Sequence, residues 1–406
     1  MAGLYIHIPF CKSRCIYCGF YSTTSLKLRQ QYVDALCREM LIGDGSRCVI
    51  SNGITQREPS PLCTIYLGGG TPSQLTTDQL RQLFLYINKV YSLPSIQGGV
   101  GGGSEVTIEM NPDDVTPEYA EVLSELGINR VSMGAQTFND ERLRFLHRRH
   151  TSSQVPQAVN ILRNAGIHNI SIDLMYGFPN ETLTDWERDI DAALALGVEH
   201  ISAYCLMIEE GTPLYRMLHK GDGSFCVIPS EITQREPSPQ CPLCDEELER
   251  QMYELLIDKL TAAGYEHYEI SNFAKPGYRS RHNSSYWQDI PYIGLGAAAH
   301  SYDGKRRSWN VSDIKQYIKA IEQGERPCDY EDIDDDTHYN DRITTALRTS
   351  DGLDMSTLSD RHRRYCMKEA QKFIDDGQLR LVDNHLSLTR KGLFVSDYIM
   401  STLMMV

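Results

Sequence analysis

Three closely spaced cysteines near the start of the chain are the residues best suited to chemistry. Cys11, Cys15 and Cys18 follow a short apolar segment in the pattern C-x3-C-x2-C, and position 20 holds Phe20 instead of a further cysteine. Thiolates are soft ligands that suit iron–sulfur clusters, zinc and copper(I). A [4Fe–4S] cluster is usually held by four cysteines, so three in one loop leave an iron open to a small molecule. The spacing favours such a cluster over the alternative, a zinc knuckle, because zinc sites pair their ligands as C-x2-C and close with four.

This loop resembles the signature of the radical S-adenosylmethionine (SAM) proteins, and the aromatic Tyr17 inside it fits the same signature. The resemblance implies that Cys11, Cys15 and Cys18 hold a [4Fe–4S] cluster whose open iron chelates the amino and carboxylate groups of SAM. It also implies that an electron from the cluster splits the SAM sulfonium to give a 5′-deoxyadenosyl radical.

The acidic charge balance argues against nucleic acid as a partner. The chain has 406 residues, is 41% hydrophobic and 23% charged, and carries a formal net charge of −14. This composition is that of an ordinary globular protein, whereas nucleic-acid-binding domains are usually basic. The basic run 361–364 is the best local exception and is expected to be a solvated helix face.

The location expected from the sequence is the cytoplasm. No signal peptide precedes Leu4, and no apolar run is long enough to cross a bilayer, although peripheral contact with a membrane stays open. Twelve cysteines without a secretory signal indicate reduced thiols in a reducing compartment.

Short apolar runs alternate with helical patterns through the first half of the chain. Such alternation predicts a parallel sheet with right-handed crossovers. Six strand–helix units are fewer than the eight of a closed (β/α)8 barrel. We therefore predict the α/β class, with an incomplete parallel (β/α)6 radical SAM barrel open along one side. The strands are expected at residues 4–8, 63–67, 105–110, 130–133, 169–175 and 200–206.

A duplicated segment interrupts this pattern. Residues 43–63 reappear as residues 221–241 with sixteen of 21 positions identical, and both copies are rich in Gly, Pro and Ser. We interpret both copies as inserted surface loops. The alternative is a second metal site that uses Cys226, Cys241 and Cys244, but a single C-x2-C lacks a matching pair.

The expected domains follow from these patterns. Residues 1–215 are predicted to form the barrel, with insert 43–63, and residues 216–244 an inserted loop repeat. Residues 245–406 are predicted to form a C-terminal α+β region that contains an H-N-x-x-Y-W motif. A hairpin over 377–389 and a helix over 391–403 give this region a winged-helix-like end. Because the chain is acidic, a packing or lid role is expected for it.

The carboxyl ends of the predicted strands each carry a polar group. Ligands of parallel α/β sheets bind at these ends. Glycines there let backbone carbonyls approach the SAM amino group, while carboxylates and amides accept its ribose hydroxyls. The SAM carboxylate would attract Arg148. The other candidates at the strand ends are Gly70, Thr71, Glu109, Gln136 and Asp173.

The match then becomes narrower. Tyr5 with HIPFC, YLGGGTPS, EMNP, GAQTF and DLMYGFP is similar to the oxygen-independent coproporphyrinogen III oxidase branch of the radical SAM proteins. This similarity implies one SAM molecule, or two, held by Tyr5, Tyr17, Gly70, Thr71, Glu109, Gln136, Arg148 and Asp173.

Within that branch the chain resembles the HemW-type heme chaperones. The oxidases have a cysteine where Phe20 stands and an extension before the first strand, and H-N-x-x-Y-W is a motif of the chaperones. Gly19 departs from them, since they commonly have Asp there. The resemblance implies heme contacts at His282, Asn283, Tyr286 and Trp287. A neutral imidazole is a common heme ligand, and aromatic rings offer flat faces for a porphyrin; the alternative is a hydrogen-bonded structural histidine.

The expected function is that of a heme chaperone that binds heme and transfers it to an unidentified acceptor protein, with an electron donor for its cluster. The alternative is an oxygen-independent coproporphyrinogen III oxidase, which oxidatively decarboxylates propionates in porphyrin biosynthesis. A radical enzyme that modifies nucleic acid is disfavoured by the charge of −14. Whether the protein is an enzyme stays open at this point.

Overall fold

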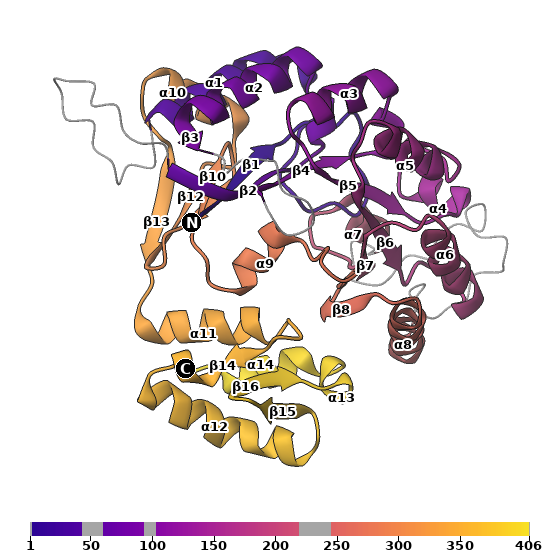
Figure 1. The fold of residues 1–406 in the computed structure, drawn as a ribbon, viewed down its shortest axis with the longest axis vertical. Helices are drawn as coiled ribbons and strands as arrows, with labels where there is room; N and C mark the ends of the chain where they lie inside the picture. Colours follow the sequence, from indigo (N-terminus) through magenta and orange to yellow (C-terminus); the bar gives the residue numbers. More distant parts are fainter. Residues whose placement is uncertain (1, 43–59, 93–102, 219–244, 406) are drawn as a thin grey trace.

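The computed structural model describes residues 2–42, 60–92, 103–218 and 245–405 (Figure 1). One large hydrophobic core extends over residues 4–321, and a second core lies within residues 339–403. The copy of the repeat at 221–241 and residues 43–59 of the other copy fall outside the described residues, as does Cys244. Residues 60–63 begin a strand of the barrel.

A parallel sheet carries the large core and confirms the predicted fold class. Its six predicted strands run side by side, and strand 105–110 has the predicted bounds. The inward face of this curved sheet carries polar residues, among them Glu109, Ser132 and Asp173. The strands are β1 (Ala2–Ile8), β2 (Ser60–Gly69), β4 (Glu105–Met110), β5 (Arg130–Gln136), β6 (Asn169–Tyr176) and β7 (His200–Cys205), and the short β3 (Tyr91–Ser92) pairs with β2.

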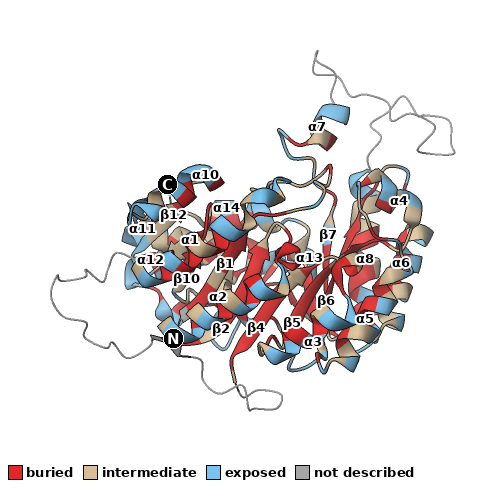
Figure 2. Ribbon diagram, turned by 90° about the horizontal axis from the view of Figure 1, so that it is seen from above, coloured by how far each residue is buried: buried red, intermediate tan, exposed pale blue. Residues whose placement is uncertain are grey.

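Helices cover the outer face of the sheet, with exposed residues turned away from the strands (Figure 2). Capping boxes start two of them, at Thr76 with Gln79 and at Thr182 with Asp185. No helix among the described residues is long and apolar enough to cross a bilayer. The helices of this layer are α1 (Arg29–Ile42), α2 (Thr77–Val90), α3 (Pro117–Glu125), α4 (Asp140–Phe145), α5 (Gln154–Asn164), α6 (Leu183–Ala195), α8 (Glu246–Ala262) and α10 (Ile314–Glu322). Helix α7 (Pro213–Leu218) lies beyond the strand ends instead, where the amide of Leu214 donates to the Ile16 carbonyl at 2.9 Å.

Both edges of the sheet are extended by strands from the second half of the chain. At one edge β10 (Tyr292–Leu295) pairs in parallel with β1, and β11 (His300–Tyr302), β12 (Arg306–Asn310) and β13 (Cys328–Asp332) follow antiparallel. At the other edge β9 (Asn272–Ala274) pairs antiparallel with β7, and β8 (Glu266–Glu269) pairs antiparallel with β9. Residues 265–273 are rich in aromatic residues and strand-like in sequence, which agrees with β8 and the start of β9, whereas no strand was predicted for β10 to β13. The domain division at residue 245 stays a prediction, and the described strands 266–332 belong to the large sheet.

The second core contains the predicted hairpin, formed by β15 (Leu379–Val382) and β16 (His385–Leu388), together with β14 (Leu353–Asp354), α11 (Asp335–Ala346) and α12 (Asp360–Asp375). The single helix predicted over 391–403 is wrong, because two helices occupy it, α13 (Arg390–Leu393) and α14 (Ser396–Leu403). At the break, the ring of Phe394 packs edge-on against Tyr253 of α8, 5.7 Å between centroids. The basic run 361–364 lies on α12, where Arg361 pairs with Asp336 at 2.7 Å.

Candidate functional site

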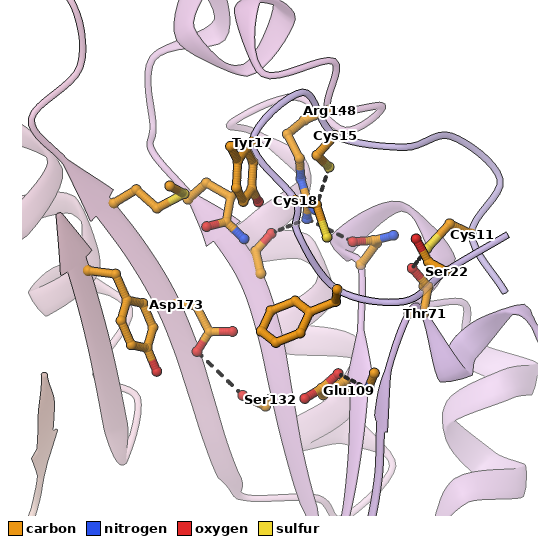
Figure 3. A pocket seen from close by; sticks show the side chains of 18 of the residues that line it. Cys11, Cys15, Tyr17, Cys18, Ser22, Thr71, Glu109, Ser132, Arg148 and Asp173 are labelled. Carbon is orange, nitrogen blue, oxygen red and sulfur yellow. Dashed lines mark hydrogen bonds between the residues drawn. The ribbon is translucent and has the colours of Figure 1, made fainter. Parts of the chain in front are cut away.

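The cysteine loop lies at the carboxyl end of β1 and is tied to the barrel by its backbone. The amide of Cys11 donates to the carbonyl of Thr23 (3.0 Å), and the amide of Ile16 donates to that of Leu146 (3.3 Å). Ile16 is buried in a small apolar cluster with residues from the ends of β6 and β7. The loop thus turns all three thiols toward one cavity of about 450 Å³ (Figure 3).

The thiols fit a cluster better than a single metal ion. Thr71 donates a hydrogen bond to the sulfur of Cys11 (3.5 Å), and Arg148 donates one to that of Cys15 (3.6 Å). Burial raises the pKa of Cys11 and of Cys18, so a bound cation is needed to hold them as thiolates. In the part of the chain that the structure describes, no three Cys, His, Asp or Glu side chains converge on one metal position. A cube of four irons takes its thiolates at separate corners, which suits thiols spread around a cavity wall.

Two half-buried carboxyl groups lie across the cavity from the thiols (Figure 3). Glu109 accepts hydrogen bonds from the Tyr66 hydroxyl (2.8 Å) and the Gly69 amide (3.0 Å). Asp173 accepts one from Ser132 at 3.4 Å. Burial raises the pKa of Glu109 to about 7 and that of Asp173 to about 6. Both groups therefore titrate close to neutral pH, and in their ionised form they can accept hydrogen bonds from ligand hydroxyls.

Arg148 joins the thiols to the ends of the strands. Its guanidinium donates to the Asn111 side-chain oxygen (2.7 Å) and the Gly134 carbonyl (2.5 Å) as well as to Cys15. Its Nε is buried and has no partner among the described residues. Gln136 nearby has a φ of 67°, an unusual backbone conformation for a residue with a side chain, and such conformations cluster at functional sites.

The structure brings most of the predicted SAM residues together around this cavity. Tyr5 lines a second cavity instead, and its ring stacks on Tyr66 of the first cavity at 6.3 Å between centroids. The first cavity also contains residues that the sequence analysis missed, among them Arg130, Ser132 and Asn111. The alternation of polar and apolar residues along β5 is a signal that could have found Arg130 and Ser132. The predicted residues that line the cavity with the cysteines are Tyr17, Gly70, Thr71, Glu109, Gln136, Arg148 and Asp173.

Gly19 is matched by an acid from another segment. A Cβ on Gly19 would lie 1.8 Å from a carboxylate oxygen of Glu209, which also lines the first cavity. The Glu209 carboxylate therefore fills the space that a side chain at position 19 would occupy.

The predicted heme motif lies on α9 (Arg281–Trp287), across the amino ends of β2 and β4. Glu105 at the start of β4 accepts hydrogen bonds from the amides of Arg281 and His282 (3.0 Å each). The His282 ring is fully buried, and its two nitrogens lie 2.8 Å from the hydroxyls of Thr64 and Tyr286. Burial lowers the pKa of His282 to about 3.

The four residues of the motif separate in the structure. Asn283 lines the first cavity and Tyr286 the second, while Trp287 lies 6.1 Å from Tyr268, between ring centroids. Their heme contacts stay predictions, and in this conformation neither nitrogen of His282 is free to bind iron.

The second cavity, of about 640 Å³, lies between the β1–β10–β11 edge of the sheet and α11 of the second core. Phe20 of the cysteine loop lines both cavities, and its side chain is 72% exposed. The cysteine loop therefore lies at the boundary of two adjacent cavities.

Comparison with known proteins agrees with the fold and the loop. The family model of the radical SAM superfamily matches residues 5–193, and that of the HemN C-terminal domain matches residues 333–395. The solved coproporphyrinogen III oxidase (HemN) of Escherichia coli has the same fold, with a TM-score of 0.75 over 99% of this chain and 89% of that one, at 22% sequence identity. The fold and the cysteine loop thus define a radical SAM protein with a HemN-type C-terminal region.

Curated relatives narrow this class. The chain is 36% identical to the heme chaperone HemW of Bacillus subtilis, over 90% of this chain and 88% of that one. It is 33% identical to the HemW of Lactococcus lactis (86% and 82%) and 32% identical to that of Escherichia coli (73% and 69%). The chain belongs to the HemW family of heme chaperones, which confirms the resemblance found in the sequence.

Proposed function

We propose that this protein binds heme and passes it to an acceptor protein, and that it carries a [4Fe–4S] cluster and SAM. The observation that carries the proposal is the 36% identity to a heme chaperone over nearly the whole of both chains. The cavity that gathers three cysteines and the strand-end residues supports the two cofactors.

In this proposal Cys11, Cys15 and Cys18 hold the cluster, and the strand ends hold SAM. When both are bound, the cluster would supply one electron to the sulfonium of SAM. Glu109 and Asp173 accept hydrogen bonds from ribose hydroxyls, and both carboxyl groups already point into the cavity. The free Nε of Arg148 and its contact with Cys15 suit a cation placed between the thiols and the ligand's carboxylate.

The partners follow from the same activity: heme, an acceptor protein and an electron donor. We place the protein in the cytoplasm. The twelve cysteines of the chain suit a reducing compartment.

The test is an anaerobic titration of the cluster-reconstituted protein with heme, followed by transfer to apomyoglobin as a generic acceptor. We expect a saturable change in the Soret band and a holo-myoglobin spectrum after mixing. Decarboxylation of coproporphyrinogen III, with 5′-deoxyadenosine formed in step, would contradict the proposal in favour of the oxidase.

Cys11→Ser tests the cluster assignment separately. The variant loses a thiolate ligand and should lose the brown cluster absorbance and most of its bound iron. Cys366→Ser is the matched control, because Cys366 is buried in the second core. Equal iron content in Cys11→Ser and wild type would contradict the assignment.

A further inference from the structure

The walls of the second cavity come from two parts of the molecule. Strands β1, β10, β11 and β12 and helix α9 form one side, and α11 of the second core forms the other. Its volume of about 640 Å³ falls in the range of about 300–1,000 Å³ typical of small-molecule sites. A flat ligand that entered it would contact both cores.

Aromatic rings dominate the sheet side. Tyr286 packs edge-on against Tyr292 with centroids 4.6 Å apart, and Tyr292 lies 6.2 Å from Tyr302. Tyr5 and Phe20 add rings from β1 and the cysteine loop. Such a lining offers faces and edges to a large planar ring system.

His300 is the exposed histidine of this cavity. Its ring makes no hydrogen bond or ion pair with any described residue, and it lies 6.1 Å from the Trp309 ring. The other histidine that lines the cavity, His7, has both ring nitrogens engaged, by the Tyr5 hydroxyl and the Tyr21 carbonyl, each at 3.0 Å. His300 therefore has the free imidazole nitrogen that a metal ligand requires.

The register of β11 and β12 places a cationic side chain on the face that carries the aromatic rings. Residues directly opposite each other in an antiparallel pair share a face, and Tyr302 stands opposite Arg307. Arg307 lines the cavity from β12 and is paired with Asp341 (2.5 Å) and Glu331 (3.3 Å), so a propionate there would compete with these acids, while Arg342 lines the cavity from α11. Guanidinium groups at the rim suit the carboxylates of an amphipathic ring.

The loop before His300 is held in an unusual conformation. Ala298 has a φ of 62°, and its amide donates to the Val311 carbonyl at 3.0 Å. Ala298 also lines the cavity. A non-glycine residue in this region costs free energy, and such residues occur at ligand-binding positions.

We propose that an iron porphyrin occupies this cavity, with the His300 imidazole as an axial ligand of the iron and Arg307 and Arg342 near the propionates. The inference rests on the proposed heme chaperone function and locates its heme site. Coordination uses the lone pair of a neutral ring nitrogen and changes no oxidation state. Because Phe20 lines both cavities, the heme would lie beside the cysteine loop.

The experiment is a titration of the cluster-loaded protein with ferric heme, read at the Soret band, for wild type and three histidine variants. His300→Ala should weaken binding by about tenfold or more and shift the Soret maximum. His385→Ala is the matched control, since His385 is an exposed histidine on β16 in the second core. His282→Ala tests the prediction from the sequence that His282 contacts the heme.

Two further readouts separate ligation from a folding defect. Added imidazole should restore the wild-type spectrum in His300→Ala, which a merely structural role would not allow. Thr345→Trp fills the cavity from α11 and should also weaken heme binding while leaving the cluster absorbance unchanged.

Unchanged affinity and spectrum in His300→Ala, with normal binding by wild type, would overturn this site and leave the chaperone function in place. A loss confined to His282→Ala would move the ligand to α9. No saturable binding by wild type would instead refute the proposed function itself.

Discussion

Glu109 and Asp173 are carboxyl groups held where a charge is costly. Burial is the main cause of their raised pKa values, and the buried Arg130 nearby opposes it. The Nε and Nη1 atoms of Arg130 have no hydrogen-bond partner in the described part of the chain. The cavity thus contains two acids that titrate near neutral pH. Arg130 lowers their pKa values but does not cancel the effect of burial. A ligand whose hydroxyls bond to the acids stabilises their charged forms.

The pH dependence of stability follows from Glu109. Its pKa in the folded protein, about 7, lies above that of an unfolded chain, so the native state binds more protons over the interval between the two values. Raising the pH from about 5 to 8 should therefore lower the free energy of unfolding, by about 2 kcal/mol from this group. Denaturant unfolding of the cluster-free protein measures this effect. Between these two pH values the free energy of unfolding should fall by about 2 kcal/mol more in wild type than in Glu109→Gln. An equal pH dependence in both proteins would contradict the assignment.

Individual site residues could be predicted from the sequence wherever a polar residue stands at the end of an apolar strand. Cys11, Glu109 and Asp173 could be assigned to one site because parallel strands end on one side. The position of the Tyr5 ring in the second cavity could not be predicted, since it depends on how the ring packs against Tyr66 inside the barrel. The engagement of both His282 nitrogens likewise depends on the contact with Thr64, which is far away in the chain, as well as on Tyr286 of the same helix.

At the scale of elements, the strands with buried faces were predictable and the added edge strands were not. Every residue of β13 is exposed, and β12 has only Asn310 buried. Such strands lack the apolar alternation that marks a strand in a sequence. Backbone pairing stabilises them instead: β13 pairs with β12, β12 with β11, and β11 with β10, which itself pairs with β1.

The close pairing of β10 and β11 depends on Gly294. A Cβ at this position would lie 1.9 Å from the His300 carbonyl oxygen. Gly294→Ala should therefore separate the two strands and destabilise the protein by about 2–4 kcal/mol, by overpacking against backbone. Because His300 lies on β11, heme affinity should fall as well.

Gly264→Ala is a useful comparison for this variant. Gly264 has a φ of 88° and no atom near the added carbon, so backbone strain of about 1 kcal/mol is its expected cost. Differential scanning fluorimetry should show a clearly larger loss for Gly294→Ala. Equal losses would mean that β11 moves freely away from β10.

For the whole molecule, the contact between the two cores is the central feature. Strand β8 and the segment after α11 meet there, where the amide of Ile270 donates to the Arg348 carbonyl at 3.1 Å. The Arg348 guanidinium pairs with the Glu269 carboxylate at 2.8 Å, and the Glu269 side chain is 1% exposed. This buried acid ties the second core to the barrel.

Arg348→Ala should loosen that connection. Removing the guanidinium leaves a buried carboxylate with fewer partners, at a cost of about 2 kcal/mol. Hydrogen exchange should become faster in β8 and in residues 347–350, with the strands β4–β6 unchanged. Adding Glu269→Gln to the variant removes the unpaired charge and should recover part of the loss. Faster exchange throughout the barrel would show that the two cores unfold together.

Gly19 and Glu209 bear on how this family can change over evolution. The two positions are far apart in the chain, yet the Glu209 carboxylate occupies the space of a side chain on residue 19. An acid at either position would place a carboxylate at the same point of the cavity wall, whereas acids at both positions would repel each other. Among related chains, an Asp at position 19 should therefore accompany the loss of the acid at position 209, and the two substitutions should arise as a pair.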